Sequence, residues 1–276
     1  MKGGNLVSYC GSANCGSAKG KSEVNQKSEG GTKMKTGRNI IRILALAVLA
    51  AGLLAVPGIM SAADCPCRSF TTDFMMGRCK GFSSEGANPF FLLKEGFQAI
   101  FEGKEGKTVI HNTITVLDEI LTIEGIETRV VEEKELHNGV LAELSRNYFA
   151  ICNRTNSVFY FGEDVDIYDA TGTIIVSHDG TWHAGVNGAK AGIVMPGVIL
   201  NGGRYFQEIA PGVAMDRAEI EGRNFTVETP AGTFDNCLKT KESTPLEPDV
   251  FEIKYYAPGI GLVKDDTLSL ISFSGN

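Results

Sequence analysis

Hydrophobic and polar residues alternate with a period of two along much of the chain after about residue 108. Phe225 and Val227 alternate with polar neighbours, and so do Phe251, Ile253 and Tyr255. A period of two places one face of a β-strand on a core and the other face in water. This part of the sequence has no capped run with the i, i+3, i+4, i+7 spacing of an amphipathic helix. The pattern therefore predicts an all-β domain.

Turn residues divide this region into segments of strand length. Asn138-Gly139 stands between two apolar-rich runs, which is the strongest short-range signal for a β-hairpin. Asp169–Gly172 predicts a second hairpin turn, between strands at 165–168 and 173–177. About ten antiparallel strands at regular spacing favour a meander that forms a curved sheet, a half-barrel or a sandwich, with few or no helices.

Three segments interrupt the pattern. Residues 90–101 fit either one short helix or an extended entry to the first strand. The Gly-rich stretch 180–203, which includes the single tryptophan Trp182, fits either a long crossover or a functional loop. Residues 64–87 combine few apolar residues with three cysteines, so we expect a flexible arm before a single β-rich domain at 88–276.

A signal peptide is predicted at residues 34–63. The apolar run 43–59 follows Arg38 and Arg42 and precedes small residues that end at Ala63. The run is shorter than the roughly 20 residues of a spanning helix, and no Lys/Arg cluster follows it. We expect cleavage between Ala63 and Asp64, no stable membrane span after cleavage, and a periplasmic or extracellular protein. An uncleaved anchor and acylation of Cys65 are the alternatives.

Residues 1–33 are rich in Gly, Ser, Asn and Lys and have no apolar period, which predicts disorder. Met34 then opens a typical signal-peptide beginning. The segment is either an extension of the gene model upstream of the true start or a genuine long n-region.

Composition makes the expected mature chain strongly acidic. The whole chain has 26 Lys and Arg and 33 Asp and Glu, a formal charge of −7. Residues 1–63 hold 8 basic and 2 acidic residues, so 18 basic and 31 acidic residues remain, a formal charge of −13. An acidic surface repels nucleic-acid phosphates and anionic lipid headgroups, and we therefore expect no nucleic-acid partner.

Five cysteines follow the expected cleavage site: Cys65, Cys67, Cys79, Cys152 and Cys237. An odd number leaves at least one thiol unpaired or joined to another molecule, and export permits disulfides. Cys152 and Cys237 fall in predicted strands and fit a pair across the core, although the sequence leaves the connectivity open. The cysteines near residue 65 lack the second pair that a structural zinc site needs.

One short segment combines metal-ligating residue types: His178, Asp179 and His183. Imidazole and carboxylate are ligands of zinc and of catalytic metals. The two histidines meet at one site only where the Asp-Gly turn bends the strand back, and two surface histidines on a solvated turn are the ordinary alternative. No G-x-S-x-G nucleophile motif is present in the sequence.

Several motifs together resemble a family of exported bacterial β-sheet proteins of unknown function. The two most specific are GTFDNCLK at 232–239 and YYAPGIGLVK at 255–264, and NPFF at 88–91, VFYFGED at 158–164 and GIVMP at 192–196 accompany them. The resemblance covers about residues 88–271. It implies a single antiparallel domain, distantly similar to the curved sheets of periplasmic lipoprotein carriers, and it supplies no catalytic residues.

These observations favour a non-enzymatic envelope protein that binds a hydrophobic small molecule or a partner protein and needs no cofactor. Two alternatives stay open. One is a metal-assisted hydrolase that uses His178, Asp179 and His183, and the other is a structural interaction protein of the envelope.

Overall fold

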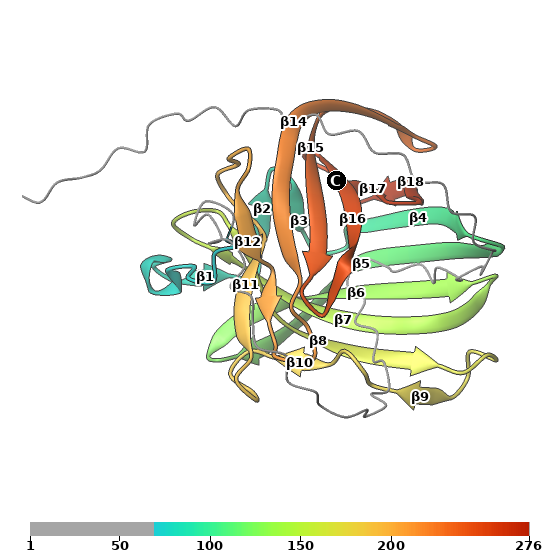
Figure 1. Cartoon of the computed structure of the whole chain (residues 1–276), viewed down its shortest axis with the longest axis horizontal. Coiled ribbons are helices and arrows are strands. Elements are labelled where there is room, and N and C mark those ends of the chain that lie inside the picture. Colours follow the sequence, from blue (N-terminus) through green and yellow to red (C-terminus); the bar gives the residue numbers. More distant parts are fainter. Residues whose placement is uncertain (1–68, 276) are drawn as a thin grey trace, which may run out of the picture. The chain divides into compact units, whose positions relative to one another are not determined.

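The computed structural model describes residues 69–275 (Figure 1). The segment 1–33, the predicted signal peptide 34–63 with its predicted cleavage site, Cys65 and Cys67 lie outside these residues. Among the described residues the structure contains strands and one 3-10 turn, η2 (Met76–Arg78), and no α-helix. The prediction of an all-β fold made of antiparallel strands is confirmed.

Two antiparallel meanders make up the sheet. The first contains β4 (Gln98–Glu105), β5 (Thr108–Ile123), β6 (Ile126–His137), β7 (Val140–Cys152) and β8 (Val158–Tyr168). The second contains β14 (Arg217–Thr229), β15 (Gly232–Thr244), β16 (Glu247–Ala257), β17 (Gly261–Asp265) and β18 (Leu268–Ser274). Strand β18 pairs with β4 and so joins the two meanders into one sheet.

Shorter strands precede and separate the meanders. Before β4 lie β1 (Phe82–Ser83), β2 (Gly86–Asn88) and β3 (Phe91–Leu93). Between β8 and β14 lie β9 (Ile175–Ser177), β10 (Trp182–His183), β11 (Lys190–Met195), β12 (Arg204–Phe206) and β13 (Glu208–Ile209). Strands β9, β10 and β11 all pair with β8.

The sheet closes through a single stretch of chain. Strand β12 pairs with β14 at one end of the sheet, and β13 pairs with β11 at the other end. Only Gln207 separates β12 from β13, so the two ends of the sheet lie side by side. The sheet is therefore nearly closed and curves like a barrel, as Figure 1 shows for the green and the orange strands.

The turns follow the chemistry that the sequence predicted. Asn138 (φ 50°) and Gly139 (φ 84°) both adopt the left-handed region, as a tight hairpin turn between β6 and β7 requires. Residues 90–101 are extended and form β3 and the start of β4, so the helical alternative is wrong. The Gly-rich stretch 180–203 contributes β10 and β11 to the sheet and is therefore part of the barrel wall.

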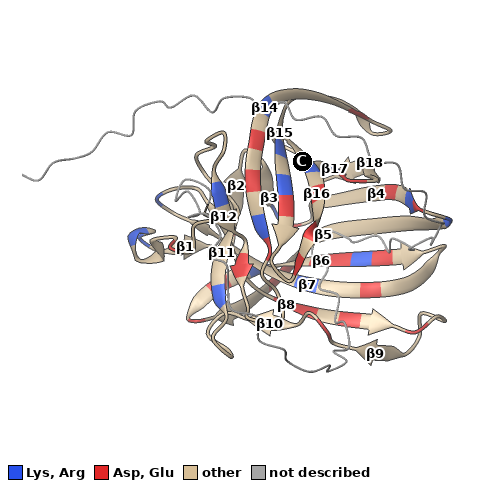
Figure 2. Cartoon of the chain, viewed as in Figure 1, with Lys and Arg blue, Asp and Glu red and all other residues tan. Residues whose placement is uncertain are grey.

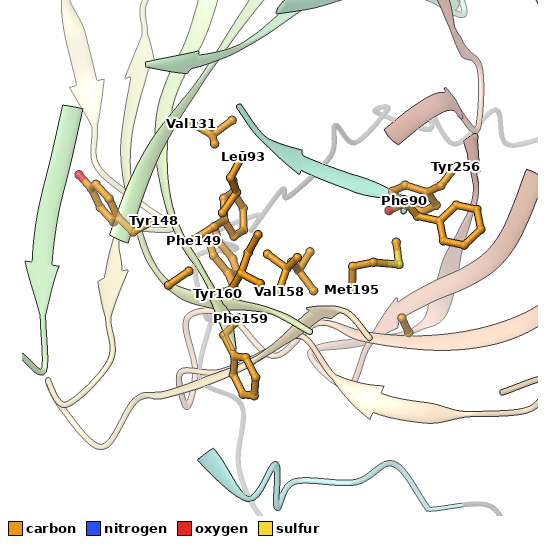
Figure 3. Close-up of a cluster of buried hydrophobic side chains, with 14 of the residues drawn as sticks. Phe90, Leu93, Val131, Tyr148, Phe149, Val158, Phe159, Tyr160, Met195 and Tyr256 are labelled. Atoms are coloured by element: carbon orange, nitrogen blue, oxygen red, sulfur yellow. The ribbon is translucent and has the colours of Figure 1, made fainter. Parts of the chain in front are cut away.

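Apolar side chains from many strands meet inside the barrel (Figure 3). Phe149 stacks on Tyr160 with ring centroids 4.8 Å apart, and Trp182 meets Tyr160 edge-on at 5.1 Å. Figure 3 shows Phe149 beside Leu93, whereas Tyr148 lies apart from this group. The separation of adjacent residues is the expected result of side chains that alternate across a strand.

The residues before β2 pack against the outside of β7 and β8. Strand β1 pairs with β7, and Phe82 meets Phe159 and Phe161 edge-on at 5.4 and 5.5 Å. Cys79 and Cys152 form a disulfide, with an S–S distance of 2.10 Å. The described part of the expected arm 64–87 is thus bound to the barrel.

Cys237 is a buried free thiol. The pairing of Cys152 with Cys237 that the sequence left open is not formed, because Cys152 is joined to Cys79.

Charged residues recur along both meanders (Figure 2). On the outer face Arg146 forms ion pairs with Glu119 at 3.0 Å and Glu132 at 3.5 Å, and Lys239 lies 2.7 Å from Glu221. Within residues 69–275 no helix has the length and the hydrophobicity to cross a membrane.

Candidate functional site

The barrel contains a partly open cavity of about 90 Å³ between the two meanders. One part of its lining is apolar and the other part is polar. The apolar part comprises Phe91, Leu92, Phe97, Ala99, Phe101, Ile114, Val116, Val131, Phe149, Val194, Ile260 and Leu262. The polar part comprises Glu133, Asn147, Gln207, Glu242, Lys254 and Tyr256. A concave apolar surface with a few converging polar groups is the usual form of a small-molecule site.

Strand register brings the polar side chains inward. Glu133 on β6 faces Ser145 on β7 and Ile114 on β5, and Val131 faces Asn147. Directly opposite residues on paired strands share a face of the sheet. Glu133 therefore lies on the inner face of β6, where Val131 also lines the cavity.

A buried lysine binds the carboxylates of the second meander. Lys254 Nζ lies 3.0 Å from Glu242, 3.7 Å from Glu252 and 3.7 Å from Asp265. Burial alone lowers the pKa of Lys254, but the three carboxylates outweigh it and raise this pKa well above its ordinary value. Lys254 therefore stays protonated in the interior.

Glu242 is the carboxylate with the most hydrogen bonds in this group. Thr240 Oγ1 and Tyr256 Oη each donate to Glu242 Oε1 at 3.1 Å, and Lys254 binds Oε2. Donors therefore reach both oxygens, which is the condition for a stable buried carboxylate.

Glu133 has a different environment. Asn112 Nδ2 donates to its Oε1 at 2.7 Å. Burial raises the pKa of Glu133 to about 8, and the nearby carboxyls of Glu143 and Glu135 act in the same direction. At neutral pH this carboxyl therefore holds a proton while it lines the cavity.

Glu163 and Glu208 have few hydrogen-bond partners in the interior. By strict hydrogen-bond geometry both oxygens of Glu163, and Oε2 of Glu208, are buried without a partner among the described residues, and the nearest donors to Glu163 are the hydroxyls of Tyr160 and Ser145. Burial raises the pKa of each well above its ordinary range, and neighbouring carboxyls add to the effect. Glu208 Oε1 accepts a hydrogen bond from the backbone N–H of Asp216 at 2.5 Å.

Glu163 lies next to the cavity. Its cross-strand partners are Asn147 on β7, which lines the cavity, and Trp182 on β10. Tyr160 packs against Trp182 and donates its hydroxyl to Asn147 Oδ1 at 2.6 Å. Glu163 is therefore on the inner face of β8, behind the polar end of the cavity.

The candidate metal-ligating residues of the sequence lie elsewhere and have separate partners. His178 Nδ1 is 2.9 Å from Asp166, and His183 Nε2 is 3.0 Å from Asp164, which also accepts a hydrogen bond from Tyr148. Asp179 lies in the turn between them, where its backbone N–H binds Ser177 Oγ. Across residues 69–275 no three His, Cys, Asp or Glu side chains are placed to hold a metal ion.

Sequence reasoning missed the residues of the barrel interior: Glu133, Glu163, Glu208, Glu242, Lys254 and Asp265. On β16 the alternation predicts that Phe251, Ile253 and Tyr255 face the core, and this is wrong, because the face with Lys254 and Tyr256 is the interior one. Phe251 is 55% exposed whereas Lys254 is 2% exposed. One signal of these residues is present in the sequence. Val131 and Glu133 are two residues apart on a long strand and therefore share a face, which indicates that the interior is partly polar.

Comparison of the chain with models of protein families, with curated proteins and with solved structures gives no match. The functional argument therefore depends on the geometry of the site.

Proposed function

We propose that this protein is an exported, non-enzymatic binding module that holds a small, mostly apolar molecule inside its barrel. The observation that supports this most directly is the cavity between the meanders, with aromatic and aliphatic residues on one side and a few polar groups on the other. This combination lets a ligand bury its apolar body and be oriented at one end.

The volume of the cavity limits the ligand. The cavity measures about 90 Å³. It is smaller than the roughly 300–1,000 Å³ of a site for a drug-sized ligand. The proposed ligand is accordingly a short molecule and not a whole lipid, and a partner protein would have to bind the outer face.

Export is part of the proposal. The Cys79–Cys152 disulfide supports it, because such bonds persist outside the reducing cytoplasm. N-terminal sequencing of the protein recovered from a bacterial envelope fraction tests this part, and we expect the sequence to begin at Asp64. A chain found intact in the cytosol would contradict it.

Native mass spectrometry of the full chain, followed by organic extraction, tests the binding function. We expect an additional mass that extraction removes. The variant Ala99→Leu fills the lumen and should lose this mass, because Ala99 lines the cavity and is 5% exposed. The control Ala170→Leu adds the same side chain on an exposed turn and should keep it.

A wild-type protein that always has the mass of the bare chain would overturn the proposed function. Circular dichroism of both variants shows whether they fold. If Ala99→Leu does not fold, the smaller Ala99→Val replaces it in the same comparison, since overpacking increases with added volume.

A further inference from the structure

The interior of the barrel contains many more buried carboxyls than buried cations. Six carboxyls are buried among the described residues: Glu133, Glu135, Glu163, Glu208, Glu242 and Asp265. The cations buried to the same degree there are Lys254 and Arg129. Arg129 donates hydrogen bonds to the backbone carbonyls of Ser84 and Leu117 and to the carboxylate of Glu85. None of these partners is one of the six buried carboxyls. Lys254 already contacts three carboxylates.

Hydrogen bonding gives a second, independent observation. Among the described residues, the buried acceptors without a hydrogen bond of strict geometry include both oxygens of Glu163, Oε2 of Glu208 and both oxygens of Asp265, although Lys254 lies 3.7 Å from Asp265. The unpartnered buried donors are Trp182 Nε1 and the hydroxyl of Tyr205, which both donates and accepts. The interior therefore lacks donors, and a bound group that only donates would correct the imbalance.

We propose that the polar end of the lumen binds a protonated primary amine on a short aliphatic body, with the ammonium at Glu133 and Glu163. This inference rests on the proposed function of the lumen as a ligand site. An ammonium has three N–H donors, no acceptor and a positive charge, and it therefore matches the groups that the interior lacks.

The positions of the two glutamates fit this occupant. Glu133 lines the cavity, and Glu163 lies behind Asn147 on the adjacent inner face. The apolar side chains of Val131 and Phe149 belong to the same lining and would contact the aliphatic body. One end of the ligand would thus meet carboxyls while the other end stays among hydrocarbon.

A metal ion fits the same groups less well. A compact cation needs several ligands that converge on one point, and no such group of three exists in residues 69–275. An alkylammonium needs only one or two carboxylates beside an apolar wall. Without a ligand the buried carboxyls are stabilised by protons instead, which agrees with the raised pKa of Glu133 and Glu163.

Isothermal titration calorimetry with three probes of equal chain length tests the inference. Butylamine, butan-1-ol and butyrate are titrated into the full chain at about pH 9, where Glu133 is ionised and an alkylammonium keeps its proton. We expect butylamine to bind at least about tenfold more tightly than butan-1-ol, and butyrate not to bind, because a tenfold ratio corresponds to one favourable charge contact.

Three variants locate the ammonium. Glu163→Gln and Glu133→Gln keep the side-chain shape and remove the charge, so each should lower butylamine affinity about tenfold and leave butan-1-ol affinity unchanged. Glu127→Gln, on an exposed position of β6, is the matched control and should change neither. Using two independent lumen variants keeps the test decisive if one of them does not fold.

The outcomes separate the inference from the proposed function. Equal affinity for butylamine and butan-1-ol would overturn the amine inference and leave the binding function standing. Butylamine binding that both lumen variants leave unchanged would also overturn the inference. If none of the three probes binds, the amine inference is overturned as well. The native mass spectrum then tests the proposed binding function separately.

Discussion

Gly192 and Gln207 meet backbone to backbone where the barrel closes. A Cβ atom on Gly192 would lie 2.5 Å from the carbonyl oxygen of Gln207 and 2.6 Å from that of Phe206. Both distances are far below van der Waals contact with backbone atoms, which cannot rotate away. The close approach of β11 to the stretch between β12 and β13 therefore requires glycine at position 192.

Gly192→Ala should destabilise the protein, because the added methyl group forces the closing strands apart. We expect a loss of about 1–3 kcal/mol in the free energy of unfolding, the usual cost of overpacking. Urea unfolding followed by circular dichroism measures it. Gly77→Ala is the control, since a Cβ there meets nothing within 4 Å. Equal midpoints for the two variants would contradict the role of Gly192 in closure.

Loss of the disulfide should destabilise the chain more strongly than loss of the free thiol. Cys79 and Cys152 are 73 residues apart in sequence, and closing a loop of that length in the unfolded chain is worth about 4 kcal/mol in the chain-entropy model. Cys79→Ser should lower the urea midpoint accordingly, and a reductant should do the same to the wild type but not to the variant.

Cys237→Ser is the control for the disulfide. The hydroxyl can replace the thiol as donor to the Phe234 carbonyl, which Cys237 Sγ reaches at 3.3 Å. We expect a change of about 1 kcal/mol or less for this substitution. A larger effect from Cys237→Ser than from Cys79→Ser would refute the prediction.

Stability should fall as the pH rises from about 4.5 to about 8. The pKa of Glu133 is raised from 4.5 to about 8 by burial, so in this range the folded state holds a proton that the unfolded state has lost. One such carboxyl contributes a slope of about −1.4 kcal/mol per pH unit. Glu163 and Glu208, whose pKa values burial also raises, act in the same direction.

Urea midpoints across this pH range measure the effect for Glu133. Glu133→Gln removes the titrating group and should make the decline shallower, whereas Glu127→Gln on the same strand should keep the wild-type slope. Parallel curves for wild type and Glu133→Gln would mean that Glu133 is not a buried acid.

Lys254→Met should be among the most destabilising substitutions in the second meander. It leaves Glu242, Glu252 and Asp265 without the ammonium that lies 3.0–3.7 Å from them. Removing one partner of a buried ion pair costs about 3–5 kcal/mol. Lys239→Met, which breaks the pair with Glu221 near the surface, should cost about 1 kcal/mol or less. Differential scanning calorimetry compares the two, and similar melting temperatures would contradict the prediction.

The class of fold was predictable from the sequence because its signals are local. Asn138 and Gly139 identify a hairpin by their tolerance of positive φ, and the glycines near residue 259 mark another turn. The closure of the sheet was not predictable, because it depends on β12 and β13 pairing with β14 and β11, far apart in sequence.

The candidate site was not predictable for a related reason. Alternation shows that β16 has two faces but does not show which face is interior, and hydrophobicity favours the side with Phe251. Lys254 lies inside, where Asp265 is directly opposite it on β17 and Glu242, two residues beyond its partner Thr240 on β15, reaches its ammonium. Phe251 lies outside, where Lys241 covers its ring at 4.0 Å. The carboxylates that neutralise Lys254 come from several strands, so the sequence of β16 alone does not show that this lysine is buried.

The pairing of β4 with β18 also constrains how the protein is made. Ala99 lies opposite Phe273, so β4 pairs with a strand that is far from it in the sequence. Until β18 pairs with it, β4 has an open edge and the lumen has a gap in its wall. Closure of the barrel therefore needs a contact between segments far apart in sequence, which is slow to form, and the unpaired edge of β4 favours aggregation until it forms.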